Sequence, residues 1–205
     1  MAPNEQTAKK PSRIQLRNRS KILEAALDVF STHGYRGSTL DQIAEAAGLS
    51  KPNILYYFDG KEEIFVTLLG SLVDQWIEPL RQIDPDGEPL EEIRRYVARK
   101  VQMSKDMERE SRLFANEILQ GAPRIGEHLS GDLQELFTRT TGILAAWMDQ
   151  GKIARVDPEH LLYSIWATTQ HYADFRSQID MLSGHGKIDS ADAFLDQLYV
   201  KLLTP

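Results

Sequence analysis

Apolar residues recur every three or four positions over most of the chain. The stretches that show this repeat are separated by short segments containing glycine or proline. Such a repeat is typical of amphipathic α-helices, whereas no stretch sustains the alternation of apolar and polar residues that marks β-strands. We therefore expect an all-α protein. About nine helices are predicted, at residues 20–32, 39–47, 50–58, 61–79, 89–105, 109–120, 126–150, 158–179 and 190–203.

The first three of these helices are short and are bounded by turn signals. Residues 33–37 contain two glycines and end the first helix, and Gly48 ends the second. Thr39 and Ser50 stand at the N-cap positions of the second and third helices, with Pro52 in the first turn of the third. This spacing predicts a helix-turn-helix, which in DNA-binding proteins places its second helix in the major groove. The same geometry also occurs in helical proteins that bind no DNA.

The charge distribution helps to decide between these interpretations. The 205 residues carry 24 Lys plus Arg and 30 Asp plus Glu, a formal net charge of −6. Residues 1–61 nevertheless hold nine basic and six acidic side chains, a net of +3. A basic N-terminus alone also fits a disordered, solubilising tail. Beside a helix-turn-helix, however, it provides the positive flank that attracts DNA phosphates, so we favour DNA binding.

Several classes of protein are disfavoured by the residues that the chain lacks. There is no cysteine, which excludes disulfides, thiol catalysis and cysteine-ligated metals. No apolar run is long enough to span a membrane, and residues 1–10 are polar, so we expect a cytoplasmic protein. Nucleotide-binding glycine motifs, nucleophile elbows and metal-binding His pairs are also missing. We expect no enzyme, metal or cofactor.

Polar and aromatic residues interrupt the apolar faces of the later helices. Trp166, Gln170 and Asp174 lie four residues apart and hence on one stripe, and Glu117 follows Phe114 on an otherwise apolar face. A buried polar residue is most often simply hydrogen-bonded to its neighbours. Several of them beside two tryptophans suit a small-molecule pocket instead. The candidate ligand-binding residues are Trp76, Arg112, Phe114, Glu117, Trp166, Gln170, His171, Tyr172 and Asp174. A rival interpretation is an all-α enzyme that acts on a small heterocycle through Glu117, His171 and Asp174.

The N-terminal part of the chain resembles the DNA-binding domain of TetR-type transcriptional repressors. The resemblance rests on SKILEAALDVF at residues 20–30, HGY at 33–35, TLDQIAEAAGLS at 39–50 and NILYYF at 53–58. The charge distribution predicts a flexible basic arm at residues 1–19. The resemblance implies a DNA-binding domain at 20–60 and an effector-binding and dimerisation domain at 61–205. It also implies a homodimer formed through the last two long helices, and an inverted-repeat operator in double-stranded DNA.

The same resemblance assigns roles around the third helix. It implies that Lys51, Tyr56 and Tyr57 contact phosphates, while Asn53 and its neighbours read bases. The candidate DNA-binding residues are Arg17, Arg19, Thr39, Ser50, Lys51, Pro52, Asn53, Tyr56, Tyr57 and Lys61.

Segments of the second half resemble the regulators of pyrimidine utilisation within this family. They include DQWIEPL at residues 74–80, SRLFANEILQGAP at 111–123 and WATTQHYADF at 166–175. The resemblance implies that uracil or thymine is the effector. Such a flat ring suits stacking on Trp76 or Trp166 and paired hydrogen bonds with the Gln170 amide. The alternative is a TetR-type repressor of an efflux or other catabolic operon that responds to a different small hydrophobic effector.

Overall fold

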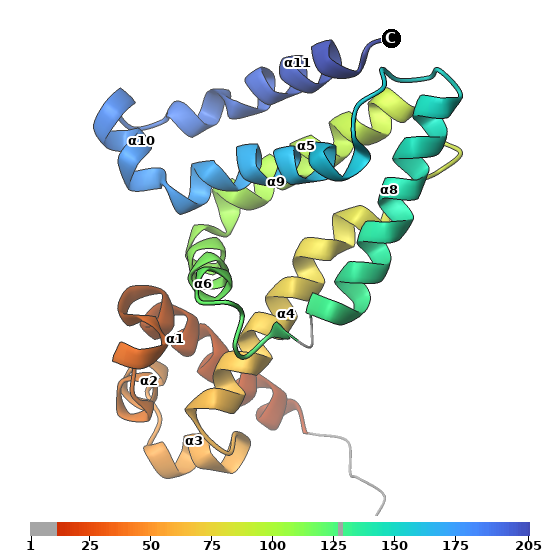
Figure 1. The fold of residues 1–205 in the computed structure, drawn as a ribbon. Helices are drawn as coiled ribbons and strands as arrows, with labels where there is room; N and C mark the ends of the chain where they lie inside the picture. The colour runs from red at the N-terminus through yellow and green to blue at the C-terminus, as the bar shows by residue number, and fades with distance from the viewer. Residues whose placement is uncertain (1–11, 127–128) are drawn as a thin grey trace, which may run out of the picture. The chain divides into compact units, whose positions relative to one another are not determined.

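The computed structural model describes residues 12–126 and 129–205 (Figure 1). Within these residues it contains ten α-helices, a short π-helical segment and a short 3₁₀ segment, with no β-strand. The predicted all-α class is confirmed, with ten helices against about nine. The chain divides into two compact units, Met1–Phe65 and Val66–Pro205. No helix in the described part of the chain is both long and apolar enough to cross a membrane.

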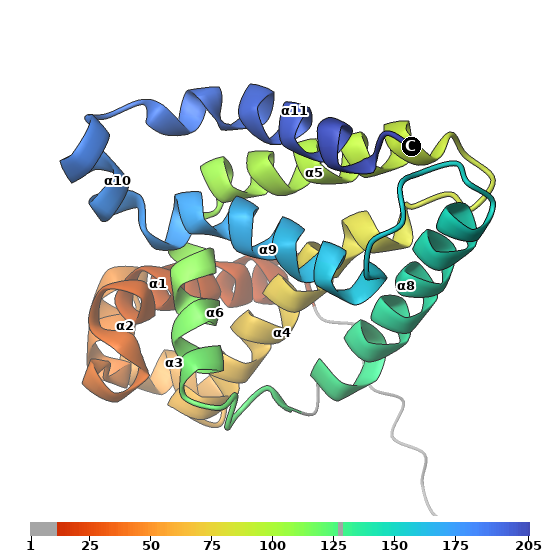
Figure 2. The same ribbon diagram turned by 45° about the horizontal axis from the view of Figure 1, so that its top comes forward.

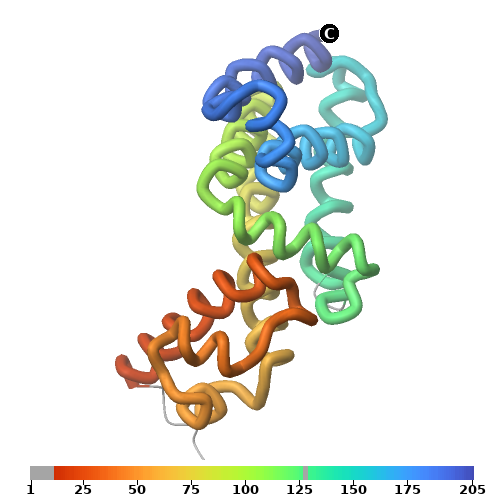
Figure 3. Tube along the Cα trace, turned by 90° about the vertical axis from the view of Figure 1, so that its left-hand side faces the viewer, coloured from red at the N-terminus to blue at the C-terminus, as the bar shows by residue number. Residues whose placement is uncertain are grey.

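The first unit contains α1 (Arg13–Gly37), α2 (Leu40–Ala47) and α3 (Lys51–Tyr57). Contacts between α1 and α2 bring these helices side by side (Figure 3). The buried side chains of the unit include Ile22, Phe30, Ile43, Ile54 and Phe58. These residues follow the apolar repeat of the sequence, so the core of this unit is the one that the periodicity predicts.

The start of α1 corrects the sequence-based prediction. The helix begins at Arg13 rather than near residue 20, so residues 13–19 are helical and not part of a flexible arm. Ser12 caps the helix by accepting a hydrogen bond from the Gln15 backbone N–H, while the Gln15 side chain accepts one from the Ser12 N–H. The rest of the predicted arm, residues 1–11, lies outside the described residues. At the other end, Gly34 leaves the helical conformation with φ 67°.

The second unit is built from longer helices. They are α4 (Lys61–Arg81), which begins in the first unit, α5 (Pro89–Asp106), α6 (Glu108–Leu119), α8 (Gln134–Asp149), α9 (Pro158–Asp174), α10 (Arg176–Ser183) and α11 (Ala191–Leu203). Helix α5 lies between α9 and α11 and contacts both (Figure 2). Its buried residues, among them Tyr96, Val97 and Val101, join a core that also includes Trp147 and Tyr199.

Two predicted helices of this unit are interrupted. In the described part of the stretch predicted as a helix at 126–150, a π-helical segment (Leu129–Leu133) precedes α8, and Gly131 within that segment is non-helical with φ −94° and ψ −112°. The stretch predicted at 158–179 divides into α9 and α10 at Phe175, whose φ is −112° and ψ 26°. A 3₁₀ segment (Lys187–Ser190) then precedes α11.

Candidate functional site

The helix-turn-helix is fixed by local caps and one glycine. The Thr39 side chain accepts a hydrogen bond from the Gln42 backbone N–H, and the Gln42 side chain accepts one from the Thr39 N–H. Gly48 ends α2 in the left-handed conformation, with φ 58° and ψ 39°, which other residues adopt at a cost. The Ser50 hydroxyl then accepts from the Asn53 backbone N–H at 3.4 Å and starts α3. The turn therefore has the predicted chemistry.

The beginning of α3 presents polar side chains to solvent. Lys51, Pro52 and Asn53 are all exposed, and Tyr56 is 69% exposed. The Lys51 ammonium lies 3.0 Å from an Asp41 carboxylate oxygen, but both side chains are largely solvated. An ion pair in that setting contributes little and leaves the lysine free to exchange partners. This face has the residues and the exposure that a DNA-reading surface needs.

The first turns of α1 are bound to α3. The Gln15 amide donates to the Tyr56 hydroxyl at 3.2 Å, and the Asn18 amide donates to the Tyr57 hydroxyl at 2.9 Å. Arg19 donates to the Tyr57 carbonyl at 3.0 Å and lies over the Phe58 ring at 4.1 Å. Residues 13–19 thus support the helix that carries the candidate DNA contacts.

Arg17 and Lys61, both predicted to bind DNA, differ from each other in their surroundings. Arg17 is exposed and belongs to the helical start of α1. Lys61 instead donates to the backbone carbonyls of Tyr35 and Ser38, at 2.8 and 2.7 Å, and its ammonium lies 4.4 Å from the Tyr35 ring centroid. These bonds tie the start of α4 to the segment between α1 and α2. They give Lys61 a structural role in the first unit.

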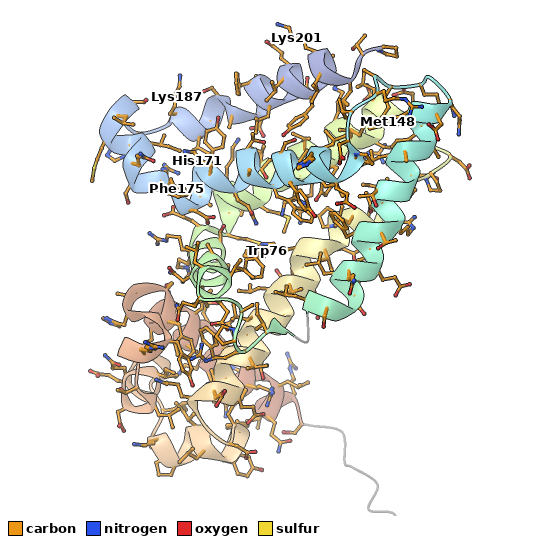
Figure 4. All side chains as sticks on the ribbon, in the orientation of Figure 1. Trp76, Met148, His171, Phe175, Lys187 and Lys201 are labelled. Carbon is orange, nitrogen blue, oxygen red and sulfur yellow. The ribbon has the colours of Figure 1, made fainter. Side chains whose placement is uncertain are left out.

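The second unit contains a cavity of about 300 Å³. Four of the predicted ligand-binding residues line it: Trp76, Phe114, Trp166 and Gln170. They come from α4, α6 and α9, so helices that are distant in sequence assemble the site. The remaining lining residues are Val73, Ile77, Leu80, Lys100, Ile118, Leu129 and Leu133. Trp76 is labelled in Figure 4 on α4.

The aromatic walls of the cavity are held in defined orientations. Trp76 meets Phe114 edge to face, with ring centroids 4.7 Å apart and an interplanar angle of 87°. The Trp166 indole N–H donates to the buried Tyr96 hydroxyl at 2.7 Å. Burial raises the pKa of Tyr96 above its usual range, so this phenol stays neutral. Among the described residues no hydrogen bond is made by the Gln170 side chain, whose amide is therefore available to a ligand.

Glu117 and Asp174, also predicted to bind the ligand, instead accept hydrogen bonds from other residues of the protein. Glu117 is 2% exposed and accepts from the Arg124 backbone N–H at 2.8 Å and from its guanidinium at 3.0 Å. Asp174 accepts from the Ser111 hydroxyl at 2.6 Å. Burial raises the pKa of the Asp174 carboxyl, and the Ser111 hydrogen bond opposes that shift. Neither residue is among those lining the main cavity.

The last three predicted ligand residues also lie outside the cavity lining. Arg112 pairs with Glu108 at 3.5 Å. His171 is exposed and stacks on Phe175 with centroids 4.8 Å apart; both are labelled in Figure 4. Tyr172 packs against the core of the unit. With Glu117 paired to Arg124 and His171 exposed, the rival catalytic grouping of Glu117, His171 and Asp174 is not assembled.

Sequence reasoning missed Lys100, which lines the cavity from α5. The side chain is 5% exposed, and burial lowers the pKa of its amine to about 8, while the charge of Asp174 opposes this. A signal was present in the sequence. Lys100 follows Tyr96 by four residues and Val97 by three, so the helical repeat places it on the buried face of α5. No group of three or more potential metal ligands gathers anywhere in residues 12–126 and 129–205.

A helix-turn-helix in one unit and a small-molecule cavity in the other are together typical of the class of helix-turn-helix transcriptional regulators. Residues 22–68 match the family model described as bacterial regulatory proteins, tetR family, and residues 69–205 match the YcdC-like protein, C-terminal region. The chain belongs to the TetR family. Regulators of this family bind DNA operators, dimerise and bind small-molecule effectors, and this chain is accordingly a transcriptional regulator rather than an enzyme.

Individual relatives support this assignment along most of the chain. The HTH-type transcriptional regulator RutR of Escherichia coli K12 is 44% identical over 178 residues, which cover 87% of this chain and 84% of that protein. The biofilm operon icaADBC negative transcriptional regulator IcaR of Staphylococcus epidermidis is 26% identical, covering 88% and 95%. Among solved structures, the ketosteroid transcriptional regulator KstR2 of Mycobacterium tuberculosis shares the fold, with a TM-score of 0.73, 20% identity and coverage of 96% and 97%.

Proposed function

We propose that this protein is a cytoplasmic, dimeric repressor that binds an inverted-repeat operator and is released from it by uracil or thymine. It would thereby control the use of pyrimidines. The observation that carries the effector assignment is the cavity that brings Trp76, Trp166 and Gln170 together. The similarity to RutR, a regulator of pyrimidine utilisation, supports the same effector class.

The chemistry of the cavity suits a small flat ring. Indole rings offer apolar faces for stacking, and a primary amide both donates and accepts, as the N–H and C=O groups of uracil require. A volume of about 300 Å³ lies at the small end of ligand pockets, which favours a metabolite over a drug-sized molecule. With about eight heavy atoms, uracil can gain at most about −12 kcal/mol, so micromolar binding is expected.

The proposed DNA surface combines α3 with the start of α1. Lys51, Tyr56 and Tyr57 are assigned to phosphates, and Asn53 with Ser50 and Pro52 to bases; Arg17, Arg19 and Thr39 complete the surface. Lys61 is left out of this proposal because two of its three ammonium donors are bound to backbone carbonyls of its own unit. Arg19 is kept because its bond to the Tyr57 carbonyl uses only part of a guanidinium that has five donors.

The proposed dimer uses the last helices of the chain. On α11, Phe194, Leu198 and Leu202 repeat every four residues and are 59%, 38% and 43% exposed. An exposed apolar stripe of this kind is typical of a helix that packs against a partner. Sedimentation should show a dimer, and Leu198→Glu should shift it toward monomer. A stable monomer of the unmutated protein at micromolar concentration would contradict the proposed dimer.

The effector proposal is tested by measuring operator affinity with and without uracil. Release from DNA requires that uracil binds the DNA-free conformation more tightly, and a coupling of about 1–3 kcal/mol would weaken operator binding about 5- to 150-fold. Gln170→Ala should abolish this response and keep operator affinity, whereas Gln102→Ala, an exposed glutamine on α5, should change neither. If uracil and thymine neither bind nor weaken operator binding, the pyrimidine proposal is wrong.

A further inference from the structure

Lys100 occupies a central position in the polar part of the cavity. It lines the main cavity and also a smaller adjoining one, and it shares both with Trp76 and Gln170. The smaller cavity adds Met103, Ser104 and Ser111. Lys100 and Gln170 are the polar side chains of the main cavity, whose other lining residues are apolar or aromatic. A ligand that enters therefore meets one ammonium group and one amide.

The Lys100 ammonium has no strong partner among the described residues. Within the described part of the chain it takes part in no hydrogen bond or ion pair, although the residue is only 5% exposed. The nearest aromatic face is that of Trp76, whose ring centroid lies 5.9 Å from Nζ, at the outer limit of a cation–π contact. Asp174 acts on Lys100 through its charge, but its carboxylate accepts a hydrogen bond from Ser111.

An ammonium group carries three donors, and burying a charge without a partner is costly. A ligand oxygen that accepts from this group removes part of that cost. A cationic ligand adds a second positive charge to an apolar space, where repulsion is screened poorly. Lys100 thus favours ligands with an acceptor oxygen and disfavours cationic ligands.

We propose that Lys100 determines which ligands the cavity accepts: rings that present a carbonyl or carboxylate oxygen to its ammonium group are bound, and cationic rings are excluded. This inference rests on the proposed function in that it takes the cavity to be the effector site. It adds to the size and shape of the effector the chemical groups that the effector must carry. Uracil and thymine satisfy it because their ring carbonyls can accept from Lys100 while the Gln170 amide pairs with the neighbouring edge.

The test compares three probes and three proteins. The probes are uracil, benzoate and benzamidine, the last two being flat rings of similar size with opposite charge. The proteins are the unmutated chain, Lys100→Met, and Arg99→Met as a control that removes an exposed charge from the same helix. Dissociation constants are measured by calorimetry or by thermal-shift titration up to millimolar ligand.

We expect the unmutated protein to bind uracil and to prefer benzoate to benzamidine. Lys100→Met should weaken uracil binding about 10- to 100-fold, the range for a hydrogen bond to a charged group, and should abolish the preference for benzoate. Arg99→Met should leave all three constants unchanged. Methionine replaces a buried unpaired charge by a group of similar volume, so the variant is expected to fold, which thermal unfolding verifies.

The outcomes separate this inference from the proposed function. If uracil binds Lys100→Met as tightly as the unmutated protein, the effector is right and the role of Lys100 is wrong. If uracil does not bind but benzoate does, through Lys100, the effector is wrong and the ligand class stands. Binding of benzamidine to the unmutated protein as tight as that of benzoate overturns the inference even without a variant, and so does the failure of both uracil and benzoate to bind.

Discussion

The two units of this protein place their candidate functional polar groups in opposite surroundings. In the first unit, the candidate DNA contacts lie on the exposed face of α3, and neighbouring caps fix the backbone beneath them. In the second, Lys100 and Gln170 project into an apolar cavity assembled from distant helices. A change at the solvated surface should therefore alter DNA binding with little effect on stability. A change among the buried polar groups should alter both ligand binding and stability.

The largest effect is expected where a buried ion pair is broken. Arg124→Met leaves the Glu117 carboxylate, whose side chain is 1% exposed, without its guanidinium partner. Removing one partner of a buried pair typically costs about 3–5 kcal/mol. Urea unfolding at pH 7 should show a loss of this size. The double variant Glu117→Gln with Arg124→Met should recover part of it, and equal stability of Arg124→Met and the unmutated protein would show that the pair contributes nothing.

A gain in stability is expected at Lys100. Burial lowers the pKa of this amine from 10.5 in the unfolded chain to about 8, so the unfolded chain binds more protons between these values. The unmutated protein should therefore gain stability as the pH rises from 8 toward 10.5. Lys100→Met should be more stable at pH 7, by up to about 3 kcal/mol.

The pH dependence provides the check on that gain. The difference between Lys100→Met and the unmutated protein should shrink as the pH rises, while Arg99→Met should show no such trend. Urea unfolding at pH 7, 8, 9 and 10 measures it. A constant difference across this range would mean that the amine is not the cause.

A smaller effect is expected at the first helix cap. Ser12→Ala removes the oxygen that accepts from the Gln15 N–H, and loss of an N-cap typically costs about 1 kcal/mol. Hydrogen exchange of the amides near residues 13–19 should accelerate, because this turn frays. Ser20→Ala, in the middle of the same helix, is the matched control and should not weaken the unit. Unchanged exchange in Ser12→Ala would show that this turn does not depend on its cap.

The smallest effect on stability is expected at Lys51, whose ion pair with Asp41 is exposed. Lys51→Ala should leave unfolding nearly unchanged but weaken binding to all DNA sequences alike, with a salt slope smaller by about 0.9. Asn53→Ala should instead relax the preference between operator variants. Binding isotherms at several salt concentrations distinguish the two. An unaltered slope for Lys51→Ala would remove this lysine from the DNA interface.

The same contrast explains which features could be predicted from the sequence. Thr39, Gly48 and Ser50 act through neighbours within a few residues, so their types and spacing suffice to predict the turn. The break at Phe175 carries no glycine or proline and was missed. So was the capping box of Ser12, because the basic residues after it suggested an arm.

The cavity was predictable only in part. Trp76, Phe114, Trp166 and Gln170 stood out as aromatic or polar residues on apolar faces, and the structure brings them together. The partner of Glu117 could not be inferred, because Arg124 reaches it through the bend that follows α6. Pairings of this kind depend on how a loop folds back, which no helical repeat encodes.

The hydrogen bonds between α1 and the two tyrosines of α3 also determine whether each tyrosine hydroxyl donates or accepts. A phenol has one proton to give, and the amides of Gln15 and Asn18 use only lone pairs of the Tyr56 and Tyr57 oxygens. The hydroxyl protons take no part in these two bonds and can be donated to a phosphodiester, which offers only acceptors. A carboxylate at position 15 or 18 would instead accept that proton, so it would no longer be available to DNA. The first turns of α1 thus keep the Tyr56 and Tyr57 hydroxyls available as hydrogen-bond donors.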